Sequence, residues 1–123
     1  MVGALFDTNI LIDFLNGVDA AKAEFDRYDT RTISVITWME VLVGTSQDDD
    51  ADIRDWLSSF EVVELDAAIA SRAVSLRRKR RIRLPDAVIW ATAQTRSLIL
   101  VTRNSKDFPA DDPGVRQPYT LQG

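Results

Sequence analysis

Residues 4–12 of the chain read ALFDTNILI, a short apolar run, three polar residues and a second apolar run. Residues 2–6 predict a β-strand, because they are apolar, few in number and followed by turn-forming residues. The polar residues 7–9 can cap a helix that begins near Ile10 and ends at Asn16-Gly17. The stretch therefore predicts a β–α unit with a carboxylate at the carboxyl end of its strand.

The same alternation continues through the rest of the chain. Further strands are predicted at residues 32–35, 61–65 and 98–102, with an additional edge strand at 119–121. Further helices are predicted at residues 19–27, 36–44, 51–60, from Asp66 to about Arg80 and from Pro85 to about Arg96. Strands that alternate with helices favour a mostly parallel sheet of four to five strands, covered by helices on both faces. No repeat or linker divides the chain, so one domain over residues 1–123 is expected.

Composition excludes several kinds of chemistry. The 123 residues include no cysteine and no histidine, so disulfides, thiolate nucleophiles, imidazole bases and imidazole metal ligands are all excluded. No apolar run approaches the roughly 20 residues of a membrane-spanning helix. The amino terminus also lacks the basic segment of a signal peptide, and we expect a soluble, cytoplasmic protein.

Charge is distributed unevenly along the chain. The net charge of −4 argues against a generic nucleic-acid-binding protein, but residues 71–106 carry ten basic residues and one acidic residue. This asymmetry favours an anionic partner for that part of the chain. The RNA-binding candidates in its densest run are Arg77, Arg78, Arg80 and Arg81. The alternative is a solvated helix end, where cations complement the helix dipole.

Three acidic residues stand inside apolar stretches: Asp7, Glu40 and Asp86. A buried carboxylate costs several kcal/mol unless a cation or hydrogen bonds compensate it. Each residue also has a purely structural explanation, since Asp7 could cap a helix, Asp86 could favour a helix first turn and Glu40 could face solvent. The three explanations together do not account for acids that recur at predicted strand ends and apolar helix starts.

The last predicted strand leads to the same edge of the sheet. Asn104 and Asp107 follow residues 98–102, and ligands of parallel sheets bind outside the carboxyl ends of the strands. Oxygen donors without histidine suit Mg²⁺ or Mn²⁺. A cation would also relieve repulsion between the carboxylates, and metal-assisted attack of water on a phosphodiester is the chemistry that follows.

Four sequence blocks resemble the PIN-domain ribonucleases, specifically the VapC-type toxins of toxin–antitoxin pairs. They are Leu5-Phe6-Asp7-Thr8-Asn9, Glu40 in its helix, Leu84-Pro85-Asp86-Ala87-Val88-Ile89, and Val101-Thr102-Arg103-Asn104-Ser105-Lys106-Asp107-Phe108. The resemblance spans residues 2–108 and implies an α/β/α sandwich that cleaves RNA with Mg²⁺ or Mn²⁺. It also implies a homodimer and a small VapB-like antitoxin whose tail blocks the active site.

The resemblance also assigns roles to individual residues. It makes Asp7 and Asp86 metal ligands and has Glu40 ligate the metal or hold its water. Asn104 and Asp107 then complete the pocket. The supporting residues are Thr8, Asn9 and Thr102, and Arg103 becomes a candidate phosphate contact whose alternative is a structural ion pair.

Two positions depart from the family pattern. Asn104 is an amide where PIN domains place a fourth acid, so it can ligate through oxygen but adds no charge. Trp90 stands where a small residue is usual, one helical turn beyond Asp86. It could line the pocket or stack on a base, although large aromatic side chains are mostly buried in a core or interface.

Two other functions compete with the nuclease interpretation. A PIN-like domain with an amide at position 104 could bind RNA without cutting it. A phospho-accepting signalling domain of the response-regulator kind would also fit the length and the alternating pattern. That domain would need a phospho-accepting acid after the third strand, where Asp66 follows only loosely.

Overall fold

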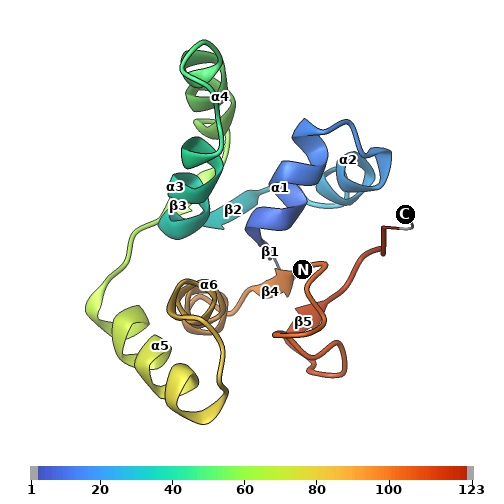
Figure 1. The fold of residues 1–123 in the computed structure, drawn as a ribbon. Helices are drawn as coiled ribbons and strands as arrows, with labels where there is room; N and C mark the ends of the chain where they lie inside the picture. The colour runs from blue at the N-terminus through green and yellow to red at the C-terminus, as the bar shows by residue number, and fades with distance from the viewer. Residues whose placement is uncertain (1–2, 122–123) are drawn as a thin grey trace.

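The computed structural model describes residues 3–121, and its five strands form one parallel sheet. The strands are β1 (Ala4–Phe6), β2 (Arg31–Ser34), β3 (Glu61–Val63), β4 (Ile99–Val101) and β5 (Val115–Arg116). Their order is β3-β2-β1-β4-β5, and every adjacent pair is parallel (Figure 1). The predicted parallel sheet is confirmed.

Six helices cover the sheet and make two cores. They are α1 (Thr8–Leu15), α2 (Asp19–Phe25), α3 (Val35–Val43), α4 (Asp50–Leu57), α5 (Ala67–Lys79) and α6 (Leu84–Thr95). Strand side chains alternate between the faces, so Leu5 packs with α5 and α6, whereas Phe6 packs with α1, α2, α3 and α4. Figure 1 shows the two groups of helices on opposite sides of the sheet. The molecule is the predicted α/β/α sandwich.

Local signals place most element ends close to their predicted positions. Helix α1 begins at Thr8 rather than Ile10, because Asp7 is its N-cap and accepts a hydrogen bond from the Thr8 amide. It ends before Gly17, whose φ of +81° favours glycine. Helix α4 ends at Leu57, earlier than predicted. The predicted start of the first strand at Val2 lies outside the described residues.

The prediction of an edge strand at residues 119–121 is wrong. The fifth strand is instead the two-residue β5, where Thr102 donates its amide proton to the carbonyl of Arg116 at 3.0 Å. Residues 119–121 have no strand conformation. The ring of Tyr119 packs against the core beside α1 and α2, and its hydroxyl donates to Asp13.

The strand order overturns the phospho-accepting interpretation. Domains of that kind have the strand order 2-1-3-4-5, in which the third strand lies next to the first. Here β2 separates β3 from β1. Asp66 caps α5 by accepting a hydrogen bond from the Ile69 amide at 2.8 Å. In the described part of the chain, no helix combines the length and the apolar character needed to cross a bilayer.

Candidate active site

Asp7 lies where β1 ends and α1 begins, and its carboxylate is 4% exposed. One oxygen accepts the Thr8 amide proton at 2.8 Å. The other accepts from the Thr102 hydroxyl at 2.7 Å and from the Asn9 side-chain amide at 3.2 Å. Strand β4 and helix α1 thus fix the carboxylate, and the cap that the sequence predicted is also a buried acid.

The charge on Asp7 is costly in this position. Burial raises its pKa to about 6, although the hydrogen bonds from Thr102 and Thr8 act in the opposite direction. The negative charges of Asp86 and Glu40 make smaller contributions to the same rise in pKa. The structure therefore brings the three sequence-predicted acids close enough to repel one another, and a bound cation would reverse that repulsion.

Glu40 enters the site from α3 through a hydroxyl relay. Its carboxylate accepts a hydrogen bond from the Thr8 hydroxyl at 2.7 Å, and Thr8 also bonds the buried Thr37 hydroxyl at 3.0 Å. Glu40 is exposed, as its structural explanation predicted. The Glu40 carboxylate is nevertheless hydrogen-bonded to Thr8, the residue that directly follows Asp7.

Asp86 lies in the first turn of α6, directly after Pro85, and is 6% exposed. Burial raises the pKa of Asp86, while the Arg83 guanidinium, 3.3 Å away, lowers it. The charges of Asp107 and Glu40 raise it again. Asp86 and Asp7 therefore both lie within electrostatic reach of Glu40.

Asn104 and Asp107 form a closed loop after β4. The Asn104 amide donates to the Thr102 hydroxyl at 3.0 Å, and its side chain donates to the Asp107 carboxylate at 3.0 Å. The Asp107 amide returns a hydrogen bond to the Asn104 side-chain oxygen at 3.2 Å. Asn104 thus orients Asp107, the carboxylate whose charge acts on Asp86.

Arg103 forms a structural ion pair, which was the alternative to a phosphate contact. Its guanidinium donates to both oxygens of Asp13, at 2.6 and 3.0 Å, rather than extending into solvent. Sequence reasoning did not single out Asp13 as a functional residue. The available signal was an acid within the apolar residues of α1, but its partner lies 90 positions away and no local pattern identifies it.

Trp90 belongs to the core and not to the pocket. Its side chain is 1% exposed and meets the Phe108 ring edge-on at a centroid distance of 5.5 Å. The Arg80 guanidinium lies 4.8 Å from the centroid of the Trp90 ring. A buried ring cannot stack on an RNA base, so that interpretation of Trp90 is wrong.

The basic run lies on the surface and leads toward Asp86. Arg77 and Arg78 occupy the last turn of α5 and are exposed, as are Arg80 and Arg81 just after it. The exposed Arg83 ends the run at its contact with Asp86. Positive charge therefore continues along the chain from the end of α5 to one of the acids of the site.

The donor set suits a hard divalent cation. Within residues 3–121, no three acidic side chains lie close enough to form a ready-made metal cage. Mg²⁺ does not require one, because it keeps several waters and binds through one or two carboxylates. Asp7 and Asp86 are two buried carboxylates whose charges interact, so the residues fit such an ion.

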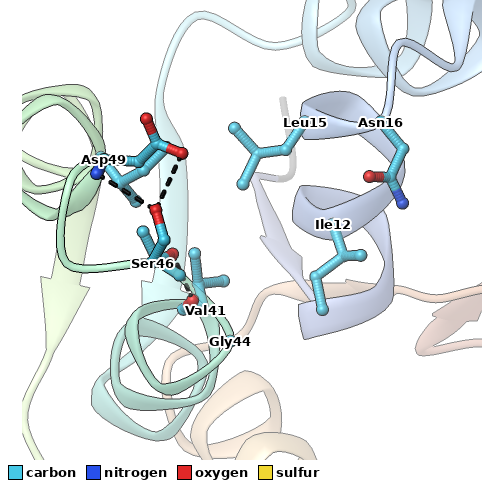
Figure 2. A pocket seen from close by; sticks show the side chains of 9 residues that line it. Ile12, Leu15, Asn16, Val41, Gly44, Ser46 and Asp49 are labelled. Atoms are coloured by element: carbon cyan, nitrogen blue, oxygen red, sulfur yellow. Dashed lines mark hydrogen bonds between the residues drawn. The ribbon is translucent and has the colours of Figure 1, made fainter.

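A partly apolar groove lies between α1, α3 and α4. It has a volume of about 340 Å³, and its lining includes Ile12 and Leu15 of α1, Val41 of α3 and Ile53 of α4. Figure 2 shows Ile12 and Leu15 on one wall, facing Val41 and Ser46 on the other. The groove shares α1 and α3 with the site, the helices that carry Thr8 and Glu40, but none of the acids of the site lines it.

Comparison with known proteins places this geometry in context. The PIN domain family profile matches residues 4–110. Ribonuclease VapC10 of Mycobacterium tuberculosis is 31% identical over 127 residues, covering 97% of this chain and 95% of that protein. The tRNA(fMet)-specific endonuclease VapC of Shigella flexneri is 30% identical and covers 88% and 91%.

A solved structure is more similar still. A toxin–antitoxin complex from Klebsiella pneumoniae contains a chain that is 46% identical to this one, with a TM-score of 0.91. The match covers 97% of this chain and all of that one. The fold and nearly the whole of this chain are therefore similar to a component of such a complex.

Proposed function

The chain belongs to the PIN domain family and is a VapC-type member of it, and from this premise we propose that it is a metal-dependent endoribonuclease. The observation that carries the proposal is the buried Asp7 carboxylate at the carboxyl end of β1, facing the charges of Asp86 and Glu40. Acids that repel each other in this way are suited to a divalent cation and to a phosphodiester that the cation neutralises.

Each residue of the site has a defined task. Asp7 and Asp86 would hold Mg²⁺ or Mn²⁺, while Thr102 and Asn9 fix Asp7. Glu40, held by Thr8, and Asp107, held by Asn104, would bind water near such an ion. When bound, such an ion would lower the pKa of water and stabilise negative charge on the phosphoryl oxygens.

RNA cleavage with and without metal tests the proposal. Purified protein should cut transfer or ribosomal RNA in Mn²⁺ or Mg²⁺, and excess EDTA should stop the reaction. Binding without cleavage under all metal conditions would favour the alternative of a PIN-like RNA-binding domain. Cleavage that continues undiminished in EDTA would exclude a metal-dependent enzyme.

We propose that the basic run binds the RNA backbone. Replacing Arg77, Arg78, Arg80 and Arg81 with glutamine should weaken RNA binding. If each contacts one phosphate, the slope of log affinity against log salt should fall by about 2 to 3 for single-stranded RNA. Filter binding at several salt concentrations measures both quantities.

A control with the same change of net charge separates local contacts from overall charge. Its four substituted residues are Lys22, Arg27, Arg31 and Arg54, which lie in or near α2, β2 and α4. Equal salt slopes for the two variants would indicate that the basic run is only a solvated helix end and does not contact RNA.

The toxin role requires a partner that silences the enzyme. We propose a small VapB-like antitoxin in the cytoplasm, bound to a toxin that is itself a homodimer. The groove lies between α1, α3 and α4, and α1 and α3 also carry Thr8 and Glu40 of the site. An antitoxin whose tail blocks the site can anchor its apolar side chains there. Ile12 and Leu15, 41% and 40% exposed, are the anchoring surface of α1.

A charge placed in this groove should disrupt the complex. Leu15→Asp is expected to weaken binding of the antitoxin encoded beside this gene by about 30-fold or more, a loss typical of an apolar anchor residue. RNA cleavage by the free toxin should be unchanged. Val74→Asp, at a residue of α5 that is 44% exposed, is the matched control, and equal affinity of both variants would place the antitoxin elsewhere.

A further inference from the structure

Two buried carboxylates on neighbouring helices are held in nearly the same way. Asp13 of α1 and Glu24 of α2 each have a side chain that is 4% exposed. Arg103 donates to both oxygens of Asp13 at 2.6 and 3.0 Å, and Arg116 donates to both oxygens of Glu24 at 2.7 and 3.0 Å. A tyrosine hydroxyl completes each group, from Tyr119 at 2.8 Å and from Tyr28 at 3.3 Å.

The two groups differ in what they adjoin. Arg103 lies between Thr102, which bonds Asp7, and Asn104, which orients Asp107. The Arg103 backbone amide also donates to the Asn9 side chain at 3.2 Å, and Asn9 in turn donates to Asp7. By contrast, the side-chain bonds of Glu24 lead to Arg27, Tyr28 and Arg116. Of these, Arg116 meets the site through its backbone carbonyl alone, which accepts the Thr102 amide proton and is kept in every side-chain variant.

We infer that Asp13, Arg103 and Tyr119 are positioning residues that set the Asn104–Asp107 loop against Asp7 and thereby tune the affinity of the site for a divalent cation. This inference rests on the proposed function. A bidentate guanidinium–carboxylate pair fixes orientation as well as distance, so it can anchor the start of the loop on α1. The Tyr119 hydroxyl donates to Asp13, so it fixes the chain segment after β5 to the same ion pair.

The close match between the two groups supplies the control. The test set consists of Asp13→Leu combined with Arg103→Met, the conservative Arg103→Lys, and Tyr119→Phe. The control set consists of Glu24→Leu combined with Arg116→Met, Arg116→Lys, and Tyr28→Phe. Apolar pairs replace the ion pairs so that no uncompensated charge is left buried. Tyr119→Phe and Arg103→Lys keep the test decisive if the double variant does not fold.

Two readouts address positioning rather than overall stability. Calorimetry with Mn²⁺ alone measures the affinity of the site. Hydrogen exchange of the metal-free protein measures protection of the Asn104 and Asp107 amides, which bond to Thr102 and Asn104. The test set should weaken Mn²⁺ binding by about 10-fold, as removal of outer-shell partners does in metal sites, and accelerate exchange at both amides. Arg103→Lys should recover part of each effect.

The control set should change neither quantity by more than about 2-fold, whatever its effect on melting temperature. Equal effects of both sets, or no effect of the test set on exchange and affinity, would overturn the inference. Failure of the wild-type protein to bind Mn²⁺ would instead refute the proposed function. The exchange measurement would still decide whether the Asp13 group positions the loop, because it uses metal-free protein.

Discussion

Asp7→Asn lowers the rate of Mn²⁺-dependent RNA cleavage by about 10³-fold or more. The reason is that Asp7 supplies a buried negative charge at the point where the acids of the site repel one another. An amide retains the shape but not the charge, and loss of several kcal/mol of charge stabilisation in the transition state corresponds to about this factor. Single-turnover cleavage at saturating Mn²⁺ measures the effect directly.

Asp66→Asn is the matched control for this substitution. Asp66 is also a helix N-cap with a side-chain hydrogen bond to the helix backbone, but it caps α5 at the end of the edge strand β3, away from the acids of the site. Its variant should cleave RNA at a rate close to that of the wild type. A similar loss in both variants would point to helix capping, and full activity of Asp7→Asn would exclude Asp7 from catalysis.

In EDTA, the stability of Asp7→Asn relative to the wild type grows by about 3 kcal/mol between about pH 3 and pH 7. Burial raises the pKa of Asp7 from 3.8 to about 6, so in this window the native state binds more protons than the unfolded state. The contribution of Asp7 to wild-type stability therefore falls as pH rises through the window, and asparagine removes that fall. Urea unfolding at several pH values measures the difference.

Metal provides the internal check on this result. On the proposed function, Mn²⁺ would bind the ionised Asp7 carboxylate of the native protein, so it should stabilise the wild type at pH 7 and have much less effect on Asp7→Asn. A difference between the two proteins that does not change with pH would mean that the pKa of Asp7 is not raised in the metal-free fold.

The predicted elements are those with strong local signals. Asp66 caps α5, Pro85 stands in the first turn of α6, and Gly17 ends the turn after α1. Strand β5 has no such signal, because it is two residues long. It is held by contacts that are distant in sequence, including the bonds from Arg116 to Glu24, 92 positions away.

The candidate site divides in the same way. Asp7, Glu40 and Asp86 could be identified because each interrupts an apolar stretch, and parallel topology brings strand ends together. The bonds from Asp13 to Arg103 and Tyr119 could not be predicted, since an acid within an apolar helix does not specify its partner. The groove also could not be predicted from the sequence, because it is formed by helices that lie apart in the chain.

Chemical analysis of the RNA ends produced by the wild-type protein in Mn²⁺ tests the central claim most directly. The chain contains no histidine, so imidazole catalysis through the RNA 2′-hydroxyl is excluded, and hydrolysis by activated water is the proposed reaction. We predict 5′-phosphate and 3′-hydroxyl ends, formed only with metal. Ends that carry a 2′,3′-cyclic phosphate would contradict a metal-dependent hydrolase.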